Sequence, residues 1–241
     1  MNDLTVIETL SEHVDICLMG GIKVVKIDHE MASAGISLFG GHLLWFKPKG
    51  EREVLWLSED ADLSGSKAIR GGVPICFPWF GNAGGEQTHG FARNVEWDLL
   101  SHTESATGVE ISLSLSESEQ TLQLWPHKFN STLTFSISHD LKISLTTENT
   151  DEKDWTYSGA IHTYFKVSDI AKTQISGVGQ RYYDGVQNYV ECQGENTMVI
   201  DKETIRVCIN PQDTIVVADS GEEKNITVEN HGHNAAVVWN P

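Results

Sequence analysis

Apolar and polar residues alternate with a period of two along several stretches, and this pattern constrains the fold more than any other feature of the chain. Between 109 and 116 apolar residues take the odd positions and Glu or Ser the even ones. The same alternation runs through 132–137, 141–146 and 226–229. Such a pattern is typical of strands that bury one face and expose the other. The chain is therefore predicted to be all-β, with antiparallel sheets.

The spacing of these stretches predicts how they connect. Ser138-His139-Asp140 is a polar break, so 131–138 and 141–149 are expected to form a hairpin. Further strands are expected over the ranges 22–28, 54–58 and 234–239. No stretch has the periodicity of a long helix, and no linker or repeat divides the chain. A single β-sandwich domain over residues 1–241 with long functional loops is expected.

Charge and cysteine content narrow the setting in which the protein works. The formal net charge of −17 argues against nucleic-acid and anionic-membrane partners. No apolar run approaches the ~18 residues that span a membrane, and the N-terminal residues do not resemble a signal peptide. The thiols form no C-x-x-C pair and fit a reducing compartment; they are Cys17, Cys76, Cys192 and Cys208. A cytoplasmic monomer is expected.

The segment from Ile69 to Arg93 is rich in glycine, proline and aromatic residues. This composition is unfavourable in a regular helix or strand but suits a rigid loop that lines a pocket. Arg70 and Arg93, two of the five arginines of the chain, lie in this segment. Guanidinium groups donate forked hydrogen bonds to anions, so an anion site is predicted. Ordinary surface ion pairs are the alternative for both arginines.

Two of the ten histidines occupy settings that indicate a site. His89 follows the glycine-rich stretch, and His162 lies in a GAIHTYF block after two aromatic residues. An imidazole in such surroundings can titrate near neutrality, which suits a general acid. A hydrogen-bonded core histidine is the alternative for each.

Other residues and motifs give weaker indications of a functional site. His231 and His233 flank a glycine without a marked third ligand, so no metal site is predicted. Trp79 and Phe80 could stack on a sugar ring, although packing in the core is the commoner role for an aromatic side chain. No G-x-S-x-G elbow, P-loop or dinucleotide fingerprint occurs.

Several blocks of the sequence, taken in order, resemble one family. They are IRGGVPICFPWFG from 69, THGFAR from 88, HTYFKVSDI from 162, ISGVG from 175, YYDGV from 182 and VVWNP from 237. Together they resemble the hexose-6-phosphate mutarotases, the glucose-6-phosphate 1-epimerase branch of the aldose epimerase superfamily. The resemblance covers nearly the whole chain. It implies an antiparallel β-supersandwich of the galactose mutarotase type.

The resemblance also implies a reaction, the exchange of α and β anomers of a hexose 6-phosphate without a cofactor. A carboxylate takes the proton of the C1 hydroxyl, a histidine protonates the ring oxygen, and the ring opens and recloses. By position His162 matches this general acid. His89 matches a second pocket histidine that donates to the sugar. Arg70 and Arg93 match substrate-binding arginines and are expected to clamp the phosphate.

Three departures from the family pattern qualify this expectation. Thr88 stands where Gln is common, and Ile205 where an Asp is found. The family's catalytic glutamate lies in a strand beyond the W-N-P block, whereas this sequence stops at Pro241. The base and the closing strands are thus expected to be absent, and Asp184 or Glu203 becomes the first substitute to test.

Three functions follow as alternatives. The first is the anomerase for hexose 6-phosphate, in a truncated form. The second is a non-catalytic module that binds sugar phosphate or carbohydrate, which the missing glutamate favours. The third is an epimerase for unphosphorylated hexose, which the arginine pair disfavours because a neutral sugar offers no anion to clamp.

Overall fold

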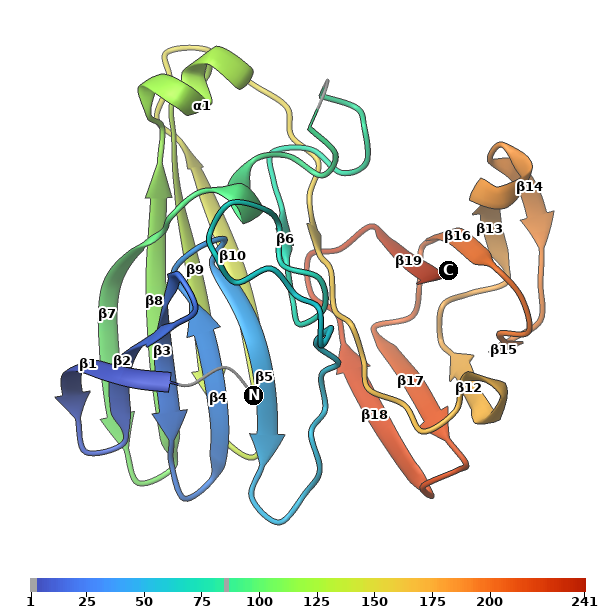
Figure 1. Ribbon diagram of the computed structural model, residues 1–241. Coiled ribbons are helices and arrows are strands. Elements are labelled where there is room, and N and C mark those ends of the chain that lie inside the picture. The colour runs from blue at the N-terminus through green and yellow to red at the C-terminus, as the bar shows by residue number, and fades with distance from the viewer. Residues whose placement is uncertain (1–3, 85–86) are drawn as a thin grey trace. The chain divides into compact units, whose positions relative to one another are not determined.

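The computed structural model describes residues 4–84 and 87–241, and strands account for most of it (Figure 1). Packing divides the chain into two compact units, one ending at Lys166 and one beginning at Val167, and each is described by itself. The all-β prediction is confirmed, and the single-domain expectation stays a prediction. No helix within the described ranges is long and apolar enough to cross a membrane.

The N-terminal unit is a sandwich of two antiparallel sheets (Figure 1). One sheet has the strand order β1-β2-β3-β4-β5, the other β10-β9-β8-β7, and the short strands β6 and β11 form a separate pair. The elements are β1 (Leu4–Ser11), β2 (Val14–Met19), β3 (Ile22–Asp28), β4 (Ala32–Ser37), β5 (His42–Pro48), β6 (Ile75–Cys76), the 3-10 helix η1 (Ala92–Asn94), β7 (Asp98–Ser105), β8 (Gly108–Ser116), α1 (Glu119–Leu124), β9 (Phe129–Ile137), β10 (Leu141–Asn149) and β11 (Ala160–Ile161).

The core of this unit lies between the two sheets. Ile27 and Ile36 of the first sheet and Ile111, Leu133 and Phe135 of the second are fully buried in one apolar cluster. Side chains of a strand point alternately to its two faces, so the period-two pattern places these residues inward. Burying each such side chain stabilises the fold by about 1.5–3 kcal/mol.

Most strands that the pattern predicts are present. β3 covers the expected range 22–28, and β9 pairs with β10 from Ile137 opposite Leu141, which confirms the hairpin. The prediction of a strand over 54–58 is wrong. Leu55 and Leu57 make only isolated bridges, because the residues opposite them, Phe165 and Gly71, belong to loops rather than to a continuous strand.

The C-terminal unit consists of two four-stranded antiparallel sheets. Their orders are β15-β12-β17-β18 and β14-β13-β16-β19. The strands predicted over 226–229 and 234–239 correspond to β18 and β19. The elements are η2 (Ile170–Lys172), β12 (Thr173–Ser176), β13 (Arg181–Asp184), η3 (Gly185–Gln187), β14 (Val190–Gln193), β15 (Thr197–Val199), β16 (Thr204–Ile209), β17 (Thr214–Asp219), β18 (Lys224–Glu229) and β19 (Ala235–Asn240).

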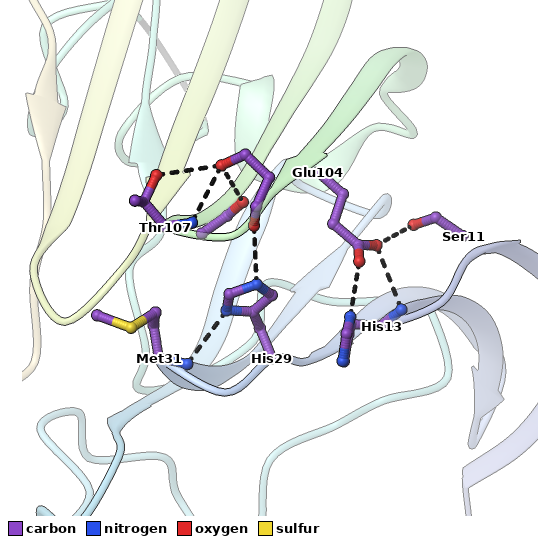
Figure 2. A network of polar contacts seen from close by, with 8 residues as sticks. Ser11, His13, His29, Met31, Glu104 and Thr107 are labelled. Atoms are coloured by element: carbon purple, nitrogen blue, oxygen red, sulfur yellow. Dashed lines mark hydrogen bonds and ion pairs between the residues drawn. The ribbon is translucent and has the colours of Figure 1, made fainter.

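At one end of the N-terminal unit a polar network ties the two sheets together (Figure 2). His13, in the turn between β1 and β2, places Nδ1 2.6 Å from Oε1 of Glu104 on β7. Oε2 of the same carboxylate accepts hydrogen bonds from Ser11 Oγ at 2.6 Å and from the His13 backbone N–H at 3.2 Å. The hydrogen bond from His13 lowers the pKa of Glu104 to about 2, and it raises the pKa of His13.

We expect Glu104→Gln to cost more stability near pH 5.5 than near pH 9. The depressed pKa of Glu104 makes its contribution present above its ordinary pKa of 4.5 and lost as pH falls towards 2. The raised pKa of His13 makes its contribution complete below 6.5 and lost as pH rises through the folded value. Urea unfolding of both proteins at the two pH values measures the difference. An equal cost at both would contradict the ion pair.

Candidate active site

The glycine-rich segment, 69–93, and the segment 159–165, which we call the HTYF segment, lie far apart in the sequence but pair as extended chains within the N-terminal unit. β6 of the first is antiparallel to β11 of the second. The His162 N–H donates to the carbonyl of Pro74 at 3.0 Å, and the Tyr164 N–H donates to that of Gly72 at 2.9 Å. Part of the predicted loop is therefore a strand-like support. Gly85 and Glu86 of this segment lie outside the described residues.

His89 is held in a left-handed turn at the other end of the glycine-rich segment, with a φ of 67°. Its backbone N–H donates to the carbonyl of Gly81 at 2.7 Å, and its Nδ1 accepts from the Gly81 N–H at 2.9 Å. The next residue, Gly90, has no room for a side chain, because a Cβ there would lie 2.1 Å from the carbonyl oxygen of Phe77. Since Nδ1 accepts, the neutral ring carries its proton on Nε2, which is left as a donor for a ligand.

The pairing of the two segments brings the predicted histidines together. The ring centroids of His89 and His162 are 5.9 Å apart, edge to face. Tyr164 stacks on His162 at 4.7 Å, and Phe80 lies 4.8 Å from the ring of His89. Trp79 is buried and donates its Nε1–H to the Gln87 carbonyl, so it supports the loop. Of the two aromatic candidates, only Phe80 packs on one of these histidines.

Arg93, on η1, adds a positive charge to this cluster. One Nη2 hydrogen bond reaches the carbonyl of Thr88 at 2.7 Å, whereas the buried Nε has no partner among the described residues. Burial first, and then the charge of Arg93, lower the pKa of His89 to about 4. The same two causes lower the pKa of His162. The neighbouring charges that shift these histidines are all positive, which favours an anionic ligand.

Arg70 lies on the Tyr164 side of the cluster. Its side chain is exposed, and its charge opposes the larger effect of burial, which raises the pKa of Tyr164. Arg93 acts on Tyr164 in the same way. The two arginines thus lie near one aromatic side chain. All four residues predicted from the sequence, Arg70, His89, Arg93 and His162, belong to the N-terminal unit.

Two residues near the predicted ones escaped the sequence analysis. His42, the first residue of β5, is fully buried, and its Nε2 lies 2.7 Å from the Gly71 carbonyl oxygen. Cys76 of β6 is also buried, and burial raises the pKa of its thiol to about 12. In the sequence, His42 is only a polar residue at the start of an apolar run. Nothing in that run indicates a connection with Arg70 or Arg93.

A metal could find ligands at one further place within the described ranges. Glu12, His13 and Glu104 each offer an atom within 4.8 Å of the others. His13 and Glu104 belong to the network of Figure 2, where Glu104 already accepts three hydrogen bonds, and Glu12 is exposed. His231 and His233 are not part of this group. The network accounts for His13 and Glu104 as a link between the two sheets.

The sandwich and its cluster of histidines and arginines correspond to a known class of sugar isomerases. Residues 23–241 match the model of the aldose 1-epimerase family, and the chain belongs to this family. The prediction of an isomerase of this type is thereby confirmed.

Relatives narrow the class further. An Escherichia coli K12 protein named “Putative glucose-6-phosphate 1-epimerase” is 40% identical over 241 residues, 99% of this chain and 81% of the relative. A Salmonella typhimurium crystal structure described as a “putative mutarotase” has a TM-score of 0.94 and 37% identity, covering 99% of this chain and 80% of that chain. These relatives confirm the resemblance to the hexose-6-phosphate mutarotases.

More distantly related proteins share the fold. A galactose mutarotase-like protein from Clostridium acetobutylicum has a TM-score of 0.77 at 14% identity, covering 99% of this chain and 84% of that chain. At this identity the likeness concerns the fold alone. It confirms the expected galactose mutarotase-like architecture.

We expect Arg93→Gln to raise the pKa of the His89 and His162 rings, because a charge that disfavours imidazolium is removed. Burial is the larger cause, so both pKa values stay below 6.5. Ring-proton NMR across a pH series measures them, with His89 titrating near 4 in the unaltered protein. Arg181→Gln is the control, since Arg181 pairs with Glu191 in the C-terminal unit. Equal shifts in both variants would contradict the arrangement.

Proposed function

We propose that this protein interconverts the α and β anomers of a hexose 6-phosphate, as a glucose-6-phosphate 1-epimerase. The observation that carries the proposal is the pairing of His89 with His162 beside Arg93, whose buried Nε has no hydrogen-bond partner within residues 4–84 and 87–241. A sugar phosphate combines the two groups that this cluster can bind. Its phosphate is a compact anion, and its sugar ring carries hydroxyl groups that form hydrogen bonds. The names of the relatives support the same substrate.

Arg93 and Arg70 bind the phosphate in this proposal. Charge-assisted hydrogen bonds to phosphate are short and strong, and a guanidinium offers several donors in a fixed plane. The net charge of −17 repels a dianion at long range. The guanidinium groups of Arg93 and Arg70 oppose that repulsion within contact distance. Because the Arg93 Nε–H is buried and no described residue accepts from it, binding an oxygen there also satisfies this donor.

His162 is the general acid that protonates the ring oxygen. Burial and the charge of Arg93 lower its pKa in the free protein, which keeps the ring neutral at neutral pH. A phosphate dianion bound at Arg93 offsets that charge and raises the pKa of His162 towards the range useful for an acid. His89 donates its Nε2–H to a sugar hydroxyl. Substrate binding thus prepares the acid for its task.

The reaction also needs a carboxylate to take the C1 hydroxyl proton. The resemblance places that base in a strand beyond the W-N-P block. Of the two substitutes within the sequence, Asp184 already accepts from the Gln187 Nε2 at 2.7 Å and from the Val186 N–H at 2.9 Å. These bonds cap η3 and help lower the pKa of Asp184, which weakens it as a base.

Arg93→Ala should weaken binding of glucose 6-phosphate by roughly tenfold or more, since a charge-assisted contact contributes about 1.5–3 kcal/mol. Binding of glucose should hardly change, because it carries no anion. Calorimetric titration with both sugars measures the difference, and Arg70→Ala extends it to the second arginine. Arg181→Ala removes an arginine from the C-terminal unit as a matched control. Unchanged selectivity in both site variants would refute the clamp.

His162→Ala should slow the exchange of anomers by ~10²-fold or more, the contribution of a positioned acid. NMR saturation transfer between the two anomeric protons of glucose 6-phosphate measures exchange, with buffer alone as the baseline. A form extended by the strands of the relatives tests the contribution of their base. Full exchange after His162→Ala in an active form would remove His162 from the mechanism. Binding without exchange in every form would favour the sugar-phosphate binding module.

A further inference from the structure

His42 occupies a place that neither the family match nor the proposed reaction assigns. It begins β5, and its side chain is fully buried. Nε2 lies 2.7 Å from the Gly71 carbonyl oxygen and therefore donates to it. Nδ1 is buried without a hydrogen-bond partner among the described residues. A charged ring would need an acceptor at both nitrogens, so this pocket suits only the neutral form.

The peptide group that His42 contacts is held at both ends. The Gly71 carbonyl accepts from His42, and the N–H of the same peptide, that of Gly72, donates to the Trp56 carbonyl at 2.7 Å. Gly71 and Gly72 have φ values of 102° and 60°. A Cβ on Gly72 would lie 2.3 Å from the Leu43 carbonyl oxygen and 2.9 Å from His42 Nε2. The peptide is therefore tightly enclosed, and Arg70 directly precedes it.

The turn before His42 also supports the second arginine. The Gly40 N–H donates to the Val95 carbonyl at 2.7 Å, and a Cβ on Gly40 would lie 2.8 Å from the Arg93 carbonyl oxygen. The turn between β4 and β5 thus packs against η1. Burial is the main cause that lowers the pKa of His42 to about 4, and the charges of Arg93 and His162 lower it further. His42 is thus a neutral hydrogen-bond donor near the charge of Arg93.

We propose that His42 is a positioning residue of the anion site, which holds the Gly71–Gly72 peptide and thereby directs Arg70 without adding a charge beside Arg93. The role rests on the proposed function, because Arg70 needs a fixed direction only if it binds an anion. Among side chains, an apolar one would leave the Gly71 carbonyl unsatisfied. A lysine would add a buried positive charge next to Arg93. A neutral imidazole avoids both costs.

The decisive comparison is between His42→Leu and His42→Gln. Leucine removes the donor, whereas the Gln Nε2 can reach the Gly71 carbonyl and does not titrate. His29→Leu is the matched control, because His29 is also buried and donates from Nε2 to a backbone carbonyl, that of Ser105 at 3.0 Å. His29 precedes β4 and His42 follows it, so the two lie at opposite ends of that strand. Circular dichroism checks that each variant is folded.

For His42→Leu we expect binding of glucose 6-phosphate to weaken roughly tenfold or more, with glucose binding unchanged, since small displacements of a binding group cost large factors. His42→Gln should stay within about twofold of the unaltered protein. His29→Leu should lose stability but not affinity. Equal affinity in His42→Leu, or equal loss for both sugars, would overturn the proposal. If His42→Leu does not fold, His42→Asn, whose amide is too short to reach Gly71, replaces it.

Hydrogen exchange of the Gly72 amide separates this proposal from the proposed function. We expect faster exchange of this amide in His42→Leu and nearly unchanged exchange in His42→Gln and His29→Leu. If the unaltered protein binds glucose 6-phosphate no better than glucose, the proposed function is wrong. The Gly72 amide then decides alone whether His42 holds the peptide, and unchanged exchange in His42→Leu would overturn that role.

Discussion

The site depends on the backbone pairing between the glycine-rich segment and the HTYF segment. This pairing sets His162 and Tyr164 opposite Pro74 and Gly72 through main-chain hydrogen bonds, whose geometry leaves little freedom. Proline lacks an N–H, so Pro74 can only accept in this arrangement, and it does so from the residue with the candidate acid. The backbone of His162 is thus fixed by peptide groups, and its ring packs against Tyr164 and His89.

A second constraint is electrostatic. The chain is strongly acidic, yet the groups that act on His42, His89 and His162 are cationic or are other histidines. Burial keeps the imidazoles neutral, which lets them lie near Arg93 without mutual repulsion. Arg93 Nε is buried too, and it has no hydrogen-bond partner in the part of the chain that the structure describes. An anion bound at Arg93 would offset its charge, and this is the physical basis of the proposal that the site takes a phosphorylated sugar.

Support for this cluster comes from the sandwich behind it. η1 packs against the turn between β4 and β5, and Phe77 and Phe91 pack with the other core aromatics. The apolar surface buried between the sheets stabilises the whole unit. At the opposite end of β4, the His13–Glu104 pair links the sheets through polar contacts instead. Apolar packing therefore supports the candidate site at one end of the unit. At the other end, the pH-dependent His13–Glu104 pair holds the two sheets together.

The sequence by itself determined several of the strands, the hairpin from 131 to 149 and the choice of the four candidate residues, because period-two alternation and dense local motifs are local signals. It also determined the family, through long blocks that stand in order. Only the tertiary structure decided that part of the glycine-rich segment pairs with the HTYF segment, that 54–58 makes isolated bridges, and that Trp79 supports the loop while Phe80 packs on His89. His42 was beyond the reach of sequence reasoning, since its role comes from a carbonyl 29 residues away in the chain. Contacts between distant segments depend on how the whole chain packs, and no local pattern records them.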